Sequence, residues 1–467
     1  MKVIAFLVIL FIMISITACI SQPLSSTSKN SPEDSTVARL VTIDPGHFHA
    51  ALVQKEMYGG IDSIVNVYAP RGPELQAHLD LIKQYNERKE HPTHWAEQVY
   101  TGNDYLDKML TDKKGNVVVI AGNNRRKTEY IKKAIDAGIN VLGDKPMAIS
   151  YNDFNNLQQS FVEAGKKNLL LYDIMTERSE ITNILQREFA HIPAVFGELE
   201  KGTAGSPAVI LESVHFFYKN VSGKTLTRPD WFFDPLQQGD AITDVGTHLI
   251  DLAQWECFPD QTIDYKKDIK ILSSKTWTTP LTRSQFTLIT KKDSLPGFLK
   301  KYVKNDSILQ TQANGEINYT LKGIHVKIIA RWDYKAPEGS GDTHYSALKG
   351  TQATLEVRQG KEEGFQPALY IIPSNEKQGN EYTSAVKQAV EKLNAAYPGI
   401  GVEKNTKGWK VIIPQKYKVG HEAHFGQVMN RYLQYLKGGK LPDWEVPNMV
   451  AKYYTSTKAL QTAIKEP

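Results

Sequence analysis

The sequence predicts an α/β fold in two parts: a doubly wound parallel sheet over residues 37–150, then an α+β domain over residues 151–467 with a large, mostly antiparallel sheet. Residues 37–150 alternate short apolar runs with helix-like segments, as parallel strands joined by helical crossovers do. After Pro207 the pattern changes to longer alternating strands, which is typical of antiparallel pairing with one buried face.

The first part contains a clear strand–helix–strand unit. A continuous apolar run at 115–121 predicts a strand, helical spacing over 128–137 predicts a helix that ends at Gly138, and 139–142 predicts the next strand. Further strands are expected at 39–43 and 63–68, a charged insert interrupts the pattern at 84–95, and beyond residue 150 a helix over 151–165 and a strand over 168–172 follow.

The second part is predicted from four strands and three helices. The strands are expected at 209–217, 270–276, 317–332 and 351–358, and the helices at 381–396, 423–437 and 446–464.

The first 36 residues are predicted to be a lipoprotein signal and a tether. Lys2 precedes an apolar run over 3–14, and residues 15–19 resemble the cleavage box of bacterial lipoproteins, which makes Cys19 the lipidated residue. The chain is then expected in the cell envelope, anchored to a bacterial membrane outside the cytoplasm. The apolar run is shorter than the about 20 residues of a membrane span, although an uncleaved N-terminal anchor stays open as an alternative. Residues 21–36 are rich in Ser, Thr and Pro, as tethers are.

The composition argues against an internal disulfide and against a nucleic-acid partner. Besides Cys19 the chain has only Cys257, so no internal disulfide is expected once Cys19 is lipidated. The net charge of +5 is small for 467 residues, and the basic and acidic residues are interleaved. We therefore expect no nucleic-acid partner, and contact with the membrane only through the lipid.

The most informative motif is Asp144-Lys145-Pro146, which follows the second strand of the strand–helix–strand unit. Ligands of open α/β sheets bind beyond the carboxyl ends of the strands, so Lys145 is expected at a binding site. The motif resembles the Glu-Lys-Pro signature of the Gfo/Idh/MocA family of nicotinamide-dependent sugar oxidoreductases. The resemblance implies a Rossmann-like N-terminal domain, contacts of Lys145 and Pro146 with NAD or NADP, and a sugar or glycoside substrate.

The first turn of the sheet departs from the phosphate-binding pattern G-x-G-x-x-G. It reads Asp44-Pro45-Gly46-His47-Phe48-His49, which keeps only the middle glycine. Gly46 is assigned to the cofactor, and the imidazoles of His47 and His49 are expected to donate hydrogen bonds to phosphate. The alternative is that this turn binds no dinucleotide, or binds one in an altered pose.

Two more positions bear on the cofactor. The second strand ends without the usual carboxylate but with Arg71 nearby, and an arginine there favours the 2′-phosphate of NADP. A solvated surface arginine is the alternative. Asn124 matches an asparagine of the family, whereas Lys127 replaces a family histidine.

The segment from Gly239 to Asp251 resembles a second family motif, G-G-x-x-x-D-x-G-x-H-x-x-D. On a helix, Asp244, His248 and Asp251 would share one face. The resemblance assigns His248 as the base, with Lys145 and Asp244 as its catalytic partners and Asp251 toward the substrate. A buried polar network and a metal site stay open as alternatives, and no residue is assigned to a metal.

Other candidates are weaker. Arg178 is similar to a family arginine and is assigned to the substrate, with an ion pair as the alternative. Trp231 is assigned to the sugar because it stands in an expected loop, whereas the other aromatics around it are expected in the core. Residues 421–424, His-Glu-Ala-His, are interpreted as structural.

Together these observations predict a lipid-anchored NAD(P)-dependent oxidoreductase acting on a sugar or glycoside. Because no free nicotinamide pool exists outside the cytoplasm, a tightly bound cofactor and redox-neutral turnover are expected, such as epimerisation or glycoside cleavage. The alternative is a cofactor-free carbohydrate-binding lipoprotein on a degenerate scaffold. A homo-oligomer through the C-terminal sheet is also anticipated.

Overall fold

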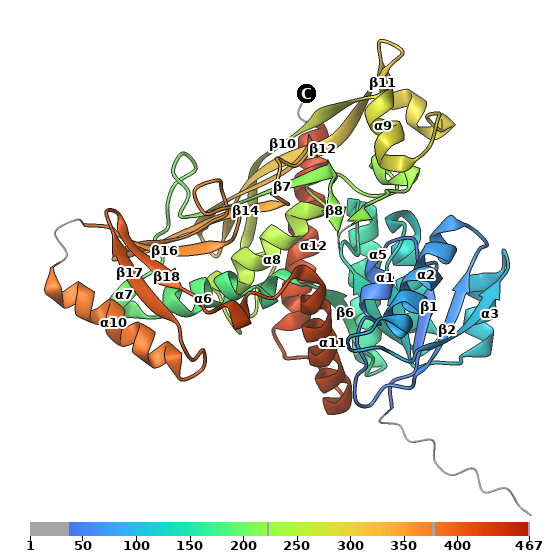
Figure 1. The fold of residues 1–467 in the computed structure, drawn as a ribbon, viewed down its shortest axis with the longest axis horizontal. Helices are drawn as coiled ribbons and strands as arrows, with labels where there is room; N and C mark the ends of the chain where they lie inside the picture. The colour runs from blue at the N-terminus through green and yellow to red at the C-terminus, as the bar shows by residue number, and fades with distance from the viewer. Residues whose placement is uncertain (1–36, 222–223, 376–378, 466–467) are drawn as a thin grey trace, which may run out of the picture. The chain divides into compact units, whose positions relative to one another are not determined.

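The computed structural model describes residues 37–221, 224–375 and 379–465 (Figure 1). Residues from Val37 onward form one compact unit. The predicted signal and tether, with Cys19, lie outside the described residues. Within the described ranges, no helix combines the length and the apolar character of a membrane span.

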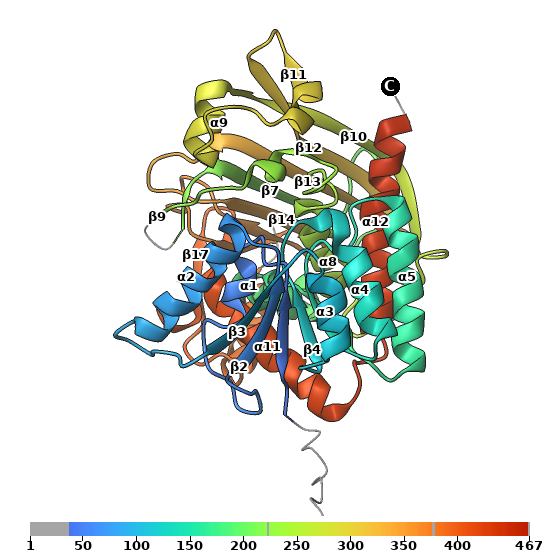
Figure 2. The same ribbon diagram turned by 90° about the vertical axis from the view of Figure 1, so that its right-hand side faces the viewer.

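The first sheet has six parallel strands in the order β3-β2-β1-β4-β5-β6, which confirms the predicted doubly wound sheet (Figure 2). The strand order reverses between β1 and β4, so the switch point at which such sheets bind ligands lies there. The strands are β1 Leu40–Ile43, β2 Ile64–Ala69, β3 Ala96–Thr101, β4 Val117–Ile120, β5 Asn140–Asp144 and β6 Leu171–Ile174.

Helices cover both faces of this sheet (Figure 2). On one face α3 (Tyr105–Asp112), α4 (Lys127–Asp136) and α5 (Tyr151–Lys166) contact one another in that order, and the other face carries α1 (His49–Leu52), α2 (Pro73–Glu87) and, from the far end of the chain, α11 (His421–Gly438). Helix α1 is only one turn long.

Three sequence-based expectations need correction here. The charged insert at 84–95 begins inside α2, and the β3 strand that follows it was missed because its side chains are mostly exposed and do not alternate. Strand β6 belongs to the parallel sheet although it lies beyond residue 150, the expected end of that domain.

The second sheet has ten strands and is antiparallel except where β13 pairs with β7, in agreement with the prediction. Its main path runs β10-β12-β13-β7-β14-β15-β16-β18-β17, and β11 pairs with β12. The bounds are β7 Val209–Tyr218, β10 Ile269–Thr282, β11 Val303–Lys304, β12 Ile308–Leu321, β13 Ile324–Lys335, β14 Thr343–Lys349, β15 Ala353–Arg358, β16 Ala368–Pro373, β17 Gly401–Asn405 and β18 Gly408–Ile412. A separate hairpin joins β8 Asn220–Val221 to β9 Lys224–Thr225.

The single strand expected over 317–332 is a hairpin, β12 and β13. Lys322 and Gly323 form its turn with φ angles of 50° and 82°. Positive φ at both central residues suits the twist of a tight hairpin. The apolar alternation continues on both sides of this turn, which is why the sequence pattern did not reveal it.

The remaining helices connect and cover the second sheet. They are α6 Ile181–Ala190, α7 Pro193–Phe196, α8 Val245–Cys257, α9 Arg283–Thr290, α10 Asn380–Asn394 and α12 Glu445–Lys465, with short 3₁₀ turns at Asn124–Arg126, Glu177–Ser179, Asp230–Phe233, Gly297–Tyr302 and Gln415–Tyr417. The predicted homo-oligomer through this sheet stays a prediction.

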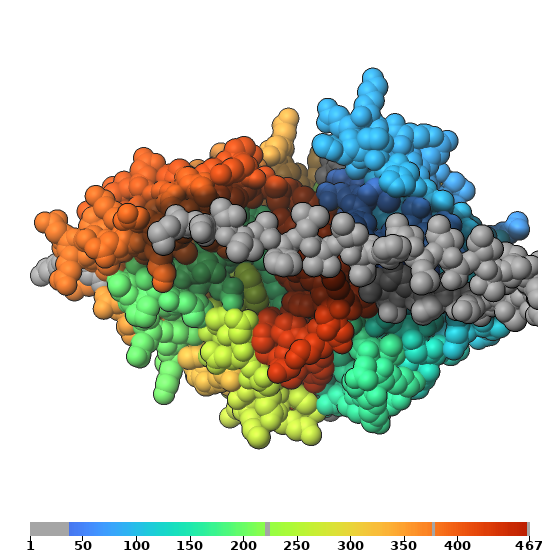
Figure 3. Space-filling view, turned by 90° about the horizontal axis from the view of Figure 1, so that it is seen from below, coloured from blue at the N-terminus to red at the C-terminus, as the bar shows by residue number. Residues whose placement is uncertain are grey.

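Helix α12 belongs to both cores. Met449 and Tyr453 pack in the core of the parallel sheet, whereas Ala451 and Ala459 pack in the core beneath the large sheet, and all four are fully buried. In Figure 3 the red surface of the last helices lies between the blue-green surface of the first domain and the green and yellow surface of the second. The end of the chain therefore holds the two sheets against each other.

Candidate active site

A cavity of about 700 Å³ lies where the two sheets face each other. One wall comes from the carboxyl ends of β1, β4 and β5, at the switch point of the parallel sheet. The other walls come from α8, from β7 and β14 of the large sheet, and from the start of α11. Both halves of the chain are therefore needed to form the site.

Lys145 and Asp244 meet across this cavity. Lys145 follows β5, and its Nζ donates a hydrogen bond of 2.7 Å to Oδ1 of Asp244, which directly precedes α8. Oδ2 of Asp244 accepts a hydrogen bond from Gln238 at 3.1 Å. Burial raises the pKa of Asp244, but the charge of Lys145 and these hydrogen bonds outweigh burial and leave the pKa below its usual value. The Asp244 carboxyl is therefore ionised at neutral pH.

His248 stands one helical turn beyond Asp244 and also lines the cavity. Its Nδ1 is buried and has no hydrogen-bond partner within the described chain. Burial lowers the pKa of His248 well below 6.5, and the charge of Lys145 lowers it further. The imidazole is therefore neutral at neutral pH and can accept a proton. The structure thus brings together the three residues predicted to be catalytic.

Asn124, predicted to contact the cofactor, lies at the cavity after β4. Its Nδ2 donates to the carbonyl of Gln238 at 2.7 Å, whereas its buried Oδ1 has no partner among the described residues. The peptide bond between Lys145 and Pro146 is cis. Pro146 itself is buried behind the cavity wall rather than lining it.

Lys127, which replaces the family histidine, is fully buried and does not line the cavity. Its Nζ donates a hydrogen bond of 2.8 Å to the backbone carbonyl of Asp144, the residue before Lys145. Burial lowers the pKa of Lys127 to about 8. Lys127 therefore holds the backbone that presents Lys145.

The first turn of the sheet differs from a glycine-rich phosphate cradle. Gly46 is tightly enclosed, because an added Cβ would lie 3.3 Å from Trp231 and 3.4 Å from the backbone nitrogen of Asn123. Asp44, at the position of the first glycine, has a φ of 45° and accepts a hydrogen bond of 2.8 Å from Tyr130. Helix α1 is too short to offer the N-terminal dipole that usually holds a diphosphate.

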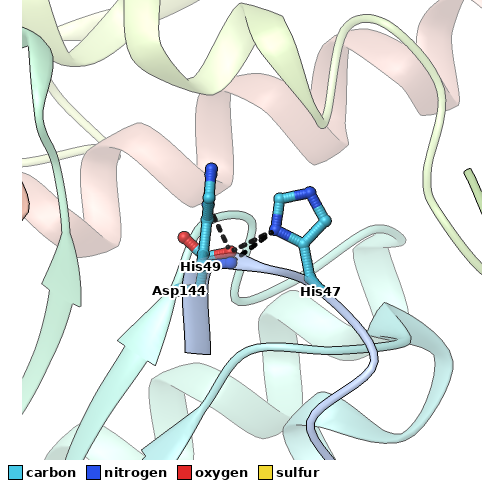
Figure 4. A group of neighbouring side chains, drawn as sticks. All are labelled: His47, His49 and Asp144. Carbon is cyan, nitrogen blue, oxygen red and sulfur yellow. Dashed lines mark hydrogen bonds and ion pairs between the residues drawn. The ribbon is translucent and has the colours of Figure 1, made fainter. Parts of the chain in front are cut away.

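His47 and His49 are directed to a carboxylate in this structure, and not to a free phosphate position as predicted. The Nδ1 atoms of His47 and His49 lie 3.8 and 3.0 Å from Oδ2 of Asp144 (Figure 4). Burial lowers the pKa of both histidines well below 6.5. Both rings line the cavity, which places them beside any ligand bound there.

These residues fit a dinucleotide unevenly. At the nicotinamide end, the unpartnered Oδ1 of Asn124, the Nζ of Lys145 and the neutral His248 surround a cavity at the expected switch point. At the diphosphate end, the glycines and the long first helix are replaced. The residues at the expected nicotinamide end therefore fit the group, whereas the first turn lacks the usual phosphate cradle.

Arg71 lies just after β2, on the surface. Its Nε donates to Oγ1 of Thr101 at 3.2 Å, and it does not line the cavity. Strand β2 ends at Ala69 without a carboxylate, as the sequence indicated.

Arg178 and Asp251 require a correction, because neither lines the cavity. They form a buried bidentate ion pair with two hydrogen bonds of 2.7 Å. Glu445 and Lys452 of α12 complete the network, with distances of 2.9 Å to Arg178 and 2.8 Å to Asp251. Asp251 lies nearly one turn beyond His248 and faces β6 and α12, so the ion-pair and polar-network alternatives replace the predicted roles in substrate binding.

Trp231 also needs correction. It is 8% exposed, packs against the turn at Gly46 and is not part of the cavity wall. Its neighbour Phe232 lines the cavity instead, together with Trp332. The guanidinium of Arg228 lies beside both rings, 4.4 and 4.9 Å from their centres, and burial lowers its pKa to about 10.

Several cavity residues were missed from the sequence. His215 of β7 and Lys219, which follows that strand, both pair with Asp342. The segment at 421–424, interpreted as structural, places His421 and His424 in the cavity wall. Seven of the twelve histidines of the chain line this cavity. They are scattered over the sequence, so the only sequence feature that pointed to a shared site was that several of the motifs contain histidine.

Comparison with known proteins agrees with this architecture. A family model described as "Oxidoreductase family, NAD-binding Rossmann fold" matches residues 44–172, and one described as "Putative oxidoreductase C terminal domain" matches residues 185–464. A crystal structure of a "putative oxidoreductase from Parabacteroides merdae ATCC 43184" is 53% identical, with a TM-score of 0.90 over 92% of this chain and 98% of that chain. A comparison with curated proteins returns no match.

More distant solved structures share the fold. A levoglucosan dehydrogenase in complex with NADH and levoglucosan is 12% identical, with a TM-score of 0.57 over 92% of this chain and 98% of that chain. An oxidoreductase domain protein from Kribbella flavida is 13% identical, with a TM-score of 0.59 over the same shares of the two chains.

Proposed function

The chain belongs to the Gfo/Idh/MocA family of oxidoreductases, and we propose that it acts on a hydroxyl-bearing carbon of a sugar or glycoside with a bound NAD(P). The observation that carries the proposal is the hydrogen-bonded Lys145–Asp244 pair beside a neutral His248 whose Nδ1 has no partner among the described residues, all in one cavity. A proton acceptor and a fixed cation at one point are what alcohol oxidation requires.

In this proposal His248 accepts the proton of the substrate hydroxyl. Lys145 donates a hydrogen bond to the same oxygen and stabilises the negative charge that develops on it. Asp244 keeps Lys145 charged and oriented, because it already holds Nζ at 2.7 Å. When bound, NAD(P) supplies the hydride chemistry at the carbon.

Asn124 and Lys145 would hold the nicotinamide half, with Pro146 fixing the backbone behind Lys145 and Gly46 allowing close packing at the first turn. The sugar class is supported by the levoglucosan dehydrogenase of the same fold, which binds NADH and levoglucosan. Arg71, exposed on the surface after β2, would contribute only weakly to any preference for NADP over NAD.

The test compares single turnovers of two variants with the wild-type chain. His248→Asn and Lys145→Met should keep the fold and the nucleotide, yet reduce bound NAD(P) roughly 10²–10⁴-fold more slowly with a sugar that the wild type oxidises. The readout is the absorbance of the reduced nicotinamide. A wild-type rate in either variant would remove that residue from the mechanism.

A second candidate function, a cofactor-free carbohydrate-binding lipoprotein, is favoured by the replaced glycines of the first turn. Titration of the wild-type chain with NAD and with NADP separates the two proposals. No binding at millimolar concentration of either nucleotide would support the binding protein and refute the oxidoreductase.

We also propose that the protein is a lipoprotein of the cell envelope whose tightly bound cofactor is reduced and reoxidised within one catalytic cycle. The support is the cleavage box that ends at Cys19. Cys19→Ala should move the protein from the membrane to the soluble fraction of its native bacterium. Retention of the variant in the membrane fraction would contradict lipidation at this residue.

A further inference from the structure

Three side chains from two separate segments converge at the first turn of the parallel sheet. His47 and His49 come from the β1–α1 turn, and Asp144 from the end of β5 (Figure 4). One potential ligand atom of each lies within 4.8 Å of the other two. In Figure 4 both imidazole rings direct a nitrogen at the same carboxylate.

The side chains of this cluster carry atoms that can bind a metal, since each histidine offers a ring nitrogen and Asp144 offers a carboxylate oxygen. Asp144 is 4% exposed, and its Oδ1 has no hydrogen-bond partner in the part of the chain that the structure describes. A neutral imidazole and a carboxylate oxygen are both ordinary metal ligands.

The carboxylate of Asp144 is bonded to no lysine or arginine side chain among the described residues. Its ion-pair partners there are His47 and His49, whereas the Nζ of Lys127 binds its backbone carbonyl and interacts with the carboxylate only through its charge. Asp251 is the contrast, since Arg178 and Lys452 both pair directly with its carboxylate. A cation held by the three side chains would therefore contact a carboxylate that has no direct lysine or arginine partner.

We propose that His47, His49 and Asp144 bind a divalent transition-metal cation of the zinc class. The distances of 3.0 and 3.8 Å from the histidine nitrogens to Oδ2 of Asp144 bracket the about 3.4 Å expected between ligands of a tetrahedral zinc ion. Three protein ligands leave a coordination position open, as in metal sites that bind water or substrate oxygen. All three residues line the cavity, so an oxygen ligand can reach that position.

The surroundings support an accessible site of this kind. The ring of His421 lies 5.5 Å from that of His49, close enough for His421 to hydrogen-bond a ligand in the open position. The cation would stand at the turn where the glycines of a phosphate cradle are replaced. It would supply the positive charge that backbone amides supply there in the usual cradle.

The test uses the full chain purified without a polyhistidine tag, stripped with a chelator and kept free of nucleotide. The chain is titrated with Co²⁺, whose binding is measured by visible absorption, and separately with Zn²⁺, whose binding is measured by calorimetry. Each titration should show that one metal ion binds per chain. Loss of a hydrogen-bond partner of a metal ligand lowers metal affinity roughly 10–100-fold. The double variant His47→Gln and His49→Gln loses two ligands themselves, so its affinity for Co²⁺ should fall by more than this.

The matched control is His78→Gln. His78 is buried, its two ring nitrogens have no partner among the described residues, and it does not line the cavity. This variant should keep full Co²⁺ binding. If the double variant fails to fold by circular dichroism, Asp144→Asn, which preserves the side-chain shape, takes its place with the same expectation.

Two results would overturn the proposal: no stoichiometric Co²⁺ binding by the wild type at millimolar metal, or unchanged binding in the folded ligand variants. Metal binding is measured here without nucleotide or sugar. A chain that binds Co²⁺ but oxidises no sugar would therefore support the metal site and contradict the proposed function, and the reverse result would do the opposite.

Discussion

Two cation–carboxylate pairs stand at helix α8, and they have opposite surroundings. Lys145 follows β5 and pairs with Asp244 at the start of the helix, whereas Arg178 follows β6 and pairs with Asp251 two turns later. Beside the first pair, His248 and Asn124 keep buried atoms without partners within the described residues. Around the second pair, Glu445 and Lys452 of α12 occupy the remaining positions.

The difference teaches that residue chemistry alone does not distinguish a reactive cluster from a structural one. Both pairs are buried and hydrogen-bonded with distances of 2.7 Å. The two pairs differ in what lies next to them. Helix α12 fills the space beside Asp251, and a cavity remains beside Asp244. Closed networks hold the fold together, whereas a cluster that still lacks partners can bind a ligand.

The largest expected effect comes from breaking the closed network. Asp251→Asn leaves Arg178 and Lys452 without their shared carboxylate in the protein interior, and should lower the free energy of unfolding by roughly 3–5 kcal/mol. Urea denaturation measures this loss. Asp244→Asn is the matched comparison, because its partner Lys145 faces the cavity and can be hydrated. An equal loss in both variants would contradict the distinction drawn between the two pairs.

A smaller effect concerns pH and His344, a histidine of the cavity wall. Burial lowers the pKa of His344 to about 4, with a further contribution from His215, whereas in the unfolded chain it is near 6.5. The unfolded state therefore binds this proton first, and His344 destabilises the folded state as the pH falls from 6.5 to 4.

His344→Gln should remove that pH-dependent loss. The difference in free energy of unfolding between variant and wild type should shift in favour of the variant by up to roughly 3 kcal/mol across this window. Denaturation at a series of pH values measures it. A difference that stays constant from pH 7 to about 4 would show that His344 titrates normally in the folded protein.

The smallest effect is expected at an exposed charge. Arg71 lies on the surface and bonds to Thr101, so any contact with a 2′-phosphate is screened by solvent. Arg71→Ala should change the ratio of NADP to NAD affinity by less than about fivefold. Fluorescence titration with both nucleotides measures the ratio, and a change of a hundredfold would place Arg71 in a desolvated phosphate site.

Part of the candidate site was predictable because its residues belong to local motifs. Lys145 stands at the end of a strand that periodicity identifies, and Asp244 and His248 lie four residues apart on one helix. The cavity wall that comes from the large sheet and from α11 was not predictable. Its residues His215 and His421 come from β7 and α11, and neither belongs to a recognisable motif. Strands β14, β16, β17 and β18 were missed as well, since short strands between irregular segments have little periodic signal.

The sequence by itself determined several of the helices and strands, the parallel character of the first sheet and the three residues proposed for catalysis, since hydrophobic period and strand-end position act over a few neighbouring residues. Only the tertiary structure decided that Asp244 lines the cavity whereas Asp251 is enclosed in an ion-pair network. The partner that closes the network at Asp251 is Lys452, 201 residues away, and the imidazoles that meet Asp144 come from about 95 residues upstream. Burial and pairing at such separations depend on how the two sheets pack through α12, which no local pattern encodes.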